Sequence, residues 1–289
     1  MKVENEQSGS LRETDETSAP LSDIYPRELL SLTERIAISI GRRINHPGLL
    51  RWFSVWWGRL FTCPVLKRVT GHRWRHHHSD RLQQISRQAP LLVVSNHRTF
   101  FDMYVGITAL RYLTKYRLGA PSVFPVRAPF FYDRPLGVIL NLIASGGCMW
   151  PPVFRDNRRE QLNQVTTAEM KSLMNLDGVC FGFHPEGKRS KSDDPFTLLP
   201  PKRGVGVLLE ESREDLVILP LFISGLSGDV KREWSLRGSD AAKTDPIEFF
   251  WGEPTSPSQF SGDAAEIASQ VHQLIQELGD EARAQAHSE

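Results

Sequence analysis

The sequence contains few cysteines, and its positive and negative charges almost balance. Its 289 residues contain three cysteines, Cys63, Cys148 and Cys180, which are scattered and show no CxxC or Cys/His ligand spacing. An odd number of scattered cysteines is typical of reduced thiols in a protein core. It does not favour a disulfide framework or a zinc site. The formal net charge is +1, which gives no support to nucleic acid as a partner.

Long apolar runs and nucleotide-binding loops are also missing. The most apolar segment, 136–150, is short and contains Asn141 and paired glycines, so we expect core rather than a membrane span. Neither a GxGxxG loop nor a GxxxxGK loop ending in Ser or Thr occurs, so nucleotide use has no support. Residues 1–23 are polar and acidic, which predicts a disordered tail and no secretory signal.

Apolar runs and helical periodicities alternate along the chain. Short apolar runs predict buried strands, and apolar residues at three- or four-residue spacing predict helices. The expected strands are 91–94, 122–126, 149–154, 178–183 and 216–223, and the expected helices are 27–44, 47–66, 101–112, 136–144, 161–175, 205–211 and 264–286. The alternation predicts an α/β fold with a mixed, largely parallel sheet covered by helices.

The same pattern suggests four parts. The tail at 1–23 is followed by an amphipathic helical region at 24–88, an α/β domain at 89–260 and an amphipathic C-terminal helix at 261–289. No internal repeat is present. We expect the catalytic or binding chemistry in the α/β domain, because ligands of such sheets bind beyond the carboxyl ends of the strands.

The helix expected at 47–66 has an aromatic stripe. Its members are Leu49, Trp52, Phe53, Trp56, Trp57, Leu60 and Phe61. Indole rings favour the headgroup region of a membrane and cations favour anionic lipid, so we expect residues 47–78, with the basic run 72–78, to contact a membrane surface. The protein would then be peripheral on the cytoplasmic side; the alternative is a core stripe. Adjacent histidines at 76–78 do not predict a metal site, because neighbours cannot all face one ion.

An imidazole and a carboxylate stand five residues apart after the strand at 91–94. His97 lies on a strand-to-helix loop, and Asp102 lies at the start of the next helix. If Asp102 accepts the proton of one ring nitrogen, the other nitrogen of His97 is free to take a proton from a bound hydroxyl. The spacing alone is weak evidence, and a surface or capping histidine is the alternative.

Basic residues gather after the predicted strands. The segment 183–190 (FHPEGKRS) follows one strand, and PKRG at 201–204 leads into a helix. The residues at or just beyond strand ends are His97, Arg127, Arg155, Arg189 and Lys202. Arginine grips phosphate through paired hydrogen bonds. We expect an anion pocket there; a solvated basic surface is the alternative.

Together the two motifs resemble those of the glycerophosphate/lysophosphatidate acyltransferase family. NHx4D at 96–102 is similar to its first motif, PEGxR at 185–189 to its third, and Leu219-Pro220-Leu221 to its fourth, so the resemblance spans about 91–222. It implies acyl transfer from a coenzyme A or acyl-carrier-protein thioester to a lysophosphatidate-type hydroxyl, with His97 as general base and Asp102 orienting it. No bound cofactor or metal is implied. The expected acceptor site is Arg127, Arg155, Glu186, Gly187, Arg189 and Lys202.

The sequence departs from the family pattern at several points. For the second motif, Arg155 matches by position, whereas Arg134 matches more literally but comes too soon after the first motif. His184 stands where the family usually has Phe, and Lys188 where it usually has Thr. Glycerol 3-phosphate, another lysophospholipid or an amino-acid lipid therefore stay open as acceptors. A membrane-surface binding protein without activity is the alternative from another class.

Overall fold

A computed structural model describes residues 25–86, 88–114, 121–240 and 244–288. The tail expected at 1–23 lies outside these residues. The seven strands form one sheet in the order β1-β7-β6-β2-β5-β3-β4. Neighbours are parallel except for the antiparallel pair β6 and β7, so the predicted mixed, largely parallel sheet is confirmed. The strands are β1 Trp74–His77, β2 Leu91–Ser95, β3 Ser122–Arg127, β4 Met149–Val153, β5 Cys180–Phe183, β6 Val217–Ser224 and β7 Ile247–Trp251.

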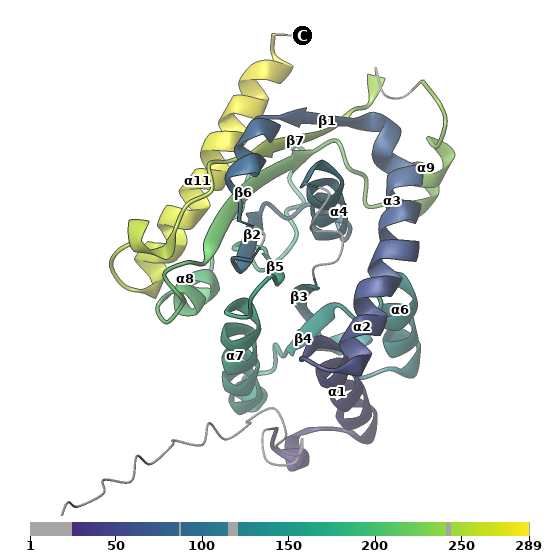
Figure 1. The fold of residues 1–289 in the computed structure, drawn as a ribbon, viewed down its shortest axis with the longest axis vertical. Helices are drawn as coiled ribbons and strands as arrows, with labels where there is room; N and C mark the ends of the chain where they lie inside the picture. Colours follow the sequence, from purple (N-terminus) through teal and green to yellow (C-terminus); the bar gives the residue numbers. More distant parts are fainter. Residues whose placement is uncertain (1–24, 87, 115–120, 241–243, 289) are drawn as a thin grey trace, which may run out of the picture.

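Helices cover both faces of the sheet. They are α1 Leu32–Asn45, α2 Leu49–Trp57, α3 Cys63–Thr70, α4 Asp102–Thr114, α5 Ala128–Phe131, α6 Pro135–Ser145, α7 Glu160–Met174, α8 Gly204–Leu209, α9 Val230–Ser235 and α11 Ala264–Ala286, with the π-helical turn η4 Gly58–Thr62 joining α2 to α3. Figure 1 shows α7, α8 and α11 along one side of the molecule and α2, α3 and α6 along the other.

The central strand β2 separates two apolar cores. Leu92 and Val94 belong to the core beneath α7, α8 and α11, whereas Leu91 and Val93 pack with the residues of α4. All four side chains are fully buried. Because a parallel strand covered on both faces is apolar at every position, this strand was recognisable as a continuous run.

The first helix begins later than its periodicity suggests. Ser31 caps α1: its hydroxyl accepts from the Glu34 backbone N–H, and the Glu34 carboxylate accepts from the Ser31 N–H. This capping box fixes the helix start at Leu32 rather than at the predicted residue 27.

Two strands at one end of the sheet were missed. The sequence pattern predicts no strand at β7, and the short β1 has the sequence WRHH, with every residue only partly buried. β1 comes from the stretch 24–88 and pairs with β7, so the sheet crosses the boundary placed at residue 88. Ile275 of α11 is fully buried in the core under this sheet, so the C-terminal helix also packs on it.

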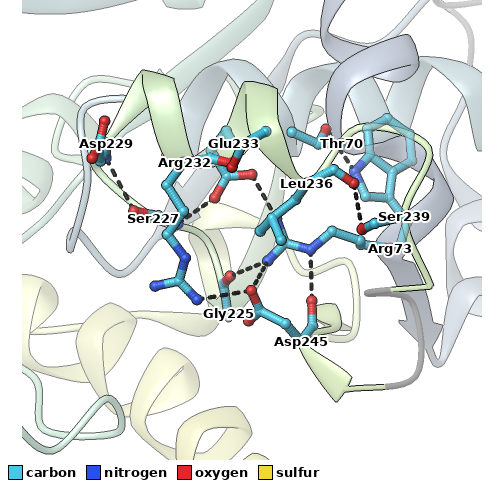
Figure 2. Close-up of polar contacts among 12 residues, drawn as sticks. Thr70, Arg73, Gly225, Ser227, Asp229, Arg232, Glu233, Leu236, Ser239 and Asp245 are labelled. Carbon is cyan, nitrogen blue, oxygen red and sulfur yellow. Dashed lines mark hydrogen bonds and ion pairs between the residues drawn. The ribbon is translucent and has the colours of Figure 1, made fainter.

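A buried arginine ties β1 to the rest of the sheet (Figure 2). Arg73 donates to the Glu233 carboxylate of α9 at 2.6 Å, to the Asp245 carbonyl before β7 at 2.6 Å, and to the Gly225 carbonyl after β6 at 3.0 Å. Its side chain is fully buried. The expectation that the basic run 72–78 faces lipid is therefore wrong for Arg73, which serves an internal ion-pair network.

The apolar segment 136–150, which we expected in the core, is only partly buried. Residues 136–144 do form helix α6, but the side chains of Leu136, Ile139, Leu140 and Ile143 are 40–63% exposed. The inner side of α6 is polar instead: the Asn141 amide donates to the Met149 carbonyl at 3.3 Å. None of the described helices is long and apolar enough to cross a membrane.

Candidate active site

His97 and Asp102 meet at the carboxyl end of β2. The Nδ1 atom of His97 is 3.2 Å from Oδ2 of Asp102. The same oxygen accepts from the backbone N–H groups of Arg98 and Thr99 at 2.6 and 2.7 Å, and the other oxygen accepts from the Thr99 hydroxyl at 2.6 Å. Because the carboxylate acts as an acceptor in all of these contacts, Nδ1 carries the ring proton and Nε2 of His97 keeps its lone pair.

The burial of the pair suits a base with a fixed partner. The Asp102 side chain is 3% exposed, whereas that of His97 is 20% exposed. Asp102 is thus enclosed by donors from its own loop, and the imidazole remains within reach of a substrate. The arrangement can move a proton from a bound hydroxyl to Nε2.

Glu186 lies beneath the His97 loop, with 1% of its surface exposed. Its Oε1 accepts the backbone N–H of His97 at 2.7 Å, and its Oε2 accepts the backbone N–H of Leu199 at 2.8 Å. Burial raises the pKa of this carboxyl, and the two backbone hydrogen bonds act in the opposite direction. The Ser190 N–H also donates to the His97 carbonyl, at 2.7 Å, so Glu186 and Ser190 together hold the backbone N–H and carbonyl of His97.

Two arginines lie beside each other at the ends of β3 and β4. Arg127 ends β3, and Arg155 follows β4 and donates to the Gly187 carbonyl at 2.8 Å. The pKa of Arg155 is lowered, first by burial and then by the positive charge of Arg127. Within the described part of the chain, neither arginine forms an ion pair with a carboxylate. Two such cations favour an anion between them.

The turn at Gly187 brings a further cation to this place. Gly187 has φ +65°, a left-handed conformation that favours glycine. A Cβ on Gly187 would stand 3.4 Å from the side chain of Lys202, whose backbone N–H donates to the Pro185 carbonyl at 2.8 Å. Arg189 is exposed on the same turn. The structure therefore groups Arg155, Gly187 and Lys202, with Arg189 at the solvent side.

The two arginines considered for the second motif lie in different places. Arg134 is an exposed residue that precedes the first turn of α6. Arg155 instead contacts the third motif through Gly187. Arg155 therefore stays the predicted arginine of the second motif.

Two neighbours of His97, Asn96 and Arg98, were not among the predicted site residues. The amide of Asn96 donates to the Ile223 carbonyl and accepts the Ile223 N–H, both at 2.9 Å, which joins the loop to β6. The Arg98 guanidinium donates to the carbonyls of Ser192 and Asp194 at 2.6 and 3.0 Å. These partners lie more than 90 residues away in the sequence. The signals in the sequence were that Asn96 belongs to the NHx4D motif and that Arg98 follows His97.

The three cysteines are buried. Cys63, Cys148 and Cys180 form no disulfide bond with one another. Over the residues that the structure describes, no group of three or more His, Cys, Asp or Glu side chains could hold a metal ion.

An exposed apolar surface lies over α2, η4, α3 and α6. The residues that form it are each at least 40% exposed, and we call them the apolar surface: Leu49, Leu50, Trp52, Phe53, Trp56, Leu60, Phe61, Val65, Leu136, Ile139, Leu140 and Ile143. α2 and α6 are joined by the Trp57 indole, which donates to the Ile143 carbonyl at 2.7 Å, and they lie on the same side in Figure 1. The alternative of a core stripe is therefore wrong, and so large a patch is typical of a protein or membrane contact.

Comparison with known proteins shows the fold and the family. No curated protein sequence matches the chain significantly. Among solved structures, the 1-acyl-sn-glycerophosphate (LPA) acyltransferase PlsC from Thermotoga maritima has a similar fold, with a TM-score of 0.50 and 17% identity over 80% of each chain. A family model described as Acyltransferase matches residues 73–224, more than half of the chain and both motifs. The chain therefore belongs to the acyltransferase family and is an O-acyltransferase, as the resemblance of its motifs implied.

Proposed function

We propose that this enzyme transfers a fatty acyl group from an acyl thioester to the hydroxyl of a lysophosphatidate-type glycerophospholipid. The observation that carries the proposal is the pairing of His97 with Asp102 at the sheet edge where Arg127 ends β3 and Arg155 follows β4. A proton acceptor and an anion site at one edge suit an acceptor that carries both a hydroxyl and a phosphate.

In the proposed reaction, Nε2 of His97 takes the proton of the acceptor hydroxyl while its oxygen attacks the thioester carbonyl carbon. The tetrahedral oxyanion collapses, the C–S bond breaks, and the proton on His97 goes to the leaving thiolate. Asp102 keeps the ring in one tautomer and stabilises its charged form. The sequence has no GxSxG elbow, so direct transfer is favoured over an acyl-enzyme. The donor is an acyl-coenzyme A or acyl carrier protein.

The cations give the proposed acceptor its orientation. Arg155, Arg127 and Lys202 would hold the phosphate, and Gly187 lets the backbone approach it. Glu186 has both oxygens occupied by backbone N–H groups, so we propose that it positions the His97 loop rather than touching the acceptor.

Replacing Arg155 by Gln is expected to lower kcat/KM for lysophosphatidate by roughly 10- to 100-fold, because a charged hydrogen bond to phosphate contributes about 1.5–3 kcal/mol. Most of the change should be in KM for the acceptor. Steady-state kinetics with varied lysophosphatidate measures it.

Arg134→Gln is the matched control, since it removes the same charge from the start of α6. It should leave kcat/KM within about twofold. If Arg134→Gln were the more damaging variant, the assignment of Arg155 to the phosphate would be wrong.

We also propose that the apolar surface rests on the membrane that holds the acceptor. It is wide, aromatic and exposed, and α6 extends it beyond the residues 47–78 first expected. Rings such as Trp52 and Trp56 suit the headgroup region. Attachment there would be peripheral.

Replacing Trp52 and Trp56 together by Glu is expected to weaken binding to anionic phospholipid vesicles by at least roughly tenfold, because two large apolar side chains are lost from the contact. Vesicle sedimentation measures the bound fraction. Ser269→Glu, on the exposed side of α11, adds negative charge away from this surface and should change binding little. Equal binding by the tryptophan variant and the wild type would refute this contact.

The proposed function is tested by label transfer from oleoyl-coenzyme A to a panel of acceptors. The panel includes lysophosphatidate, glycerol 3-phosphate and zwitterionic or neutral lysolipids. Product with lysophosphatidate above the other acceptors supports the proposal. Product with lysolipids that lack a phosphomonoester would overturn the role of the arginines, and no product with any acceptor or donor, acyl carrier protein included, would overturn the reaction.

A further inference from the structure

A second imidazole lies flat against His97. The ring centroids of His97 and His184 are 4.0 Å apart, and the ring planes differ by 8°. The two residues come from the loops after β2 and β5, which are parallel neighbours in the sheet. His97 is thus held at Nδ1 by Asp102 and against one ring face by His184.

His184 is itself anchored to the strand that carries the base. Its Nδ1 lies 3.0 Å from the Ser95 carbonyl and 3.2 Å from the Ser95 hydroxyl oxygen. A carbonyl oxygen can only accept, so Nδ1 of His184 carries a proton, and in the neutral ring Nε2 then carries none. Because Ser95 is the last residue of β2, the supporting ring and the base are fixed to the same strand end.

The surroundings keep His184 uncharged. Burial, and then the neighbouring His97, lower the pKa of His184 to about 3, although Asp102 acts in the opposite direction. Two imidazoles in face contact do not both bind a second proton readily, because like charges at this distance repel. An uncharged ring at this place leaves His97 as the member of the pair that receives a proton, and its π face tolerates the cation that forms.

We propose that His184 is a positioning residue of this acyltransferase: its neutral ring stacks on His97, fixes the plane of the base, and leaves the transferred proton on His97. The proposal rests on the proposed role of His97 as base. The orientation of the His97 ring affects the chemical step more than substrate binding, since a small misplacement of a reacting group lowers the rate strongly.

His184→Ala removes the ring, whereas His184→Phe keeps a flat ring without the Nδ1–H. We expect His184→Ala to lower kcat roughly 10- to 100-fold with both KM values within about threefold, and His184→Phe to restore kcat to at least about a third of the wild-type value. His77→Ala is the matched control, because His77 stacks on Phe250 at 4.1 Å and 9° but lies in β1. It should leave kcat unchanged.

A wild-type kcat in His184→Ala would overturn the proposal. So would an equal loss in His184→Phe and His184→Ala when both variants unfold at the wild-type temperature, because the stacked ring would then not be what matters.

A second measurement does not depend on acyl transfer. In protein labelled with 15N-histidine, the signals lost in His184→Phe identify His184, and the 15N shifts report its tautomer and charge. We expect a neutral ring protonated at Nδ1 from roughly pH 5 to 8. A proton on Nε2, or a titration within this range, would overturn the proposal. If the wild type transfers to no acceptor while these signals are as expected, the proposed function fails and the anchoring of His184 stands.

Discussion

Replacing His97 by Ala is expected to lower kcat/KM for acyl transfer by roughly 10²- to 10⁴-fold, the contribution of a positioned general base. The reason is that Nε2 is the free ring nitrogen of the pair, while Nδ1 is held by Asp102. Asp102→Asn should also lower kcat/KM strongly, because an amide nitrogen cannot accept the donors that surround this position. Label transfer from oleoyl-coenzyme A to lysophosphatidate measures both variants.

The loss in His97→Ala should occur without loss of the fold. The backbone N–H and carbonyl of residue 97, which bond Glu186 and Ser190, remain in the variant. Its thermal midpoint is therefore expected close to that of the wild type. His287→Ala, at the exposed end of α11, serves as the histidine control and should keep full activity. More than about a tenth of wild-type activity in His97→Ala would exclude it as the base.

Replacing Arg73 by Met is expected to destabilise the protein by about 3–5 kcal/mol, the range found when one partner of a buried ion pair is removed. The Glu233 carboxylate, 6% exposed, would lose its cation. The carbonyls of Gly225 and Asp245 would lose their donors as well. Urea unfolding followed by circular dichroism measures the difference in the free energy of unfolding.

Arg232→Met is the matched control for Arg73→Met. The Asp245 carboxylate pairs with Arg73 at 3.0 Å and with Arg232 at 2.8 Å, but the Arg232 side chain is 56% exposed. Exposed pairs contribute little, so the expected loss is at most about 0.5–1 kcal/mol. If the two variants lost equal stability, the buried network would not hold β1 in the way inferred from Figure 2.

The contact between His97 and Asp102 was open to prediction because it is local. His97 and Asp102 are five residues apart, and one loop followed by one helical turn brings them together. The strand before them was equally clear, since Leu91 to Val94 are buried on both faces. The motif then pointed to the family that the comparison shows.

Glu186 and His184 needed the tertiary structure. The sequence indicated a tight turn at Gly187. The Glu186 carboxylate lies among basic residues in that turn, so the sequence suggested that it orients neighbouring cations. Its two backbone partners, His97 and Leu199, lie 89 and 13 residues away. No spacing rule links His184 to the face of His97 either, because their contact depends on β2 and β5 being neighbours in the sheet.

The sequence by itself determined the α/β class, the first and third motifs, the His97–Asp102 pair and the aromatic stripe of α2. These depend on local periodicity and on short loops. Only the tertiary structure decided that α6 is exposed, that Arg73 is buried and that Glu186 accepts the backbone N–H of His97. Exposure and pairing depend on which distant segments cover a residue. The physical reason is that an apolar side chain can lie on the surface or in the core, and a charged side chain can be buried once it has an opposite charge and hydrogen-bond partners.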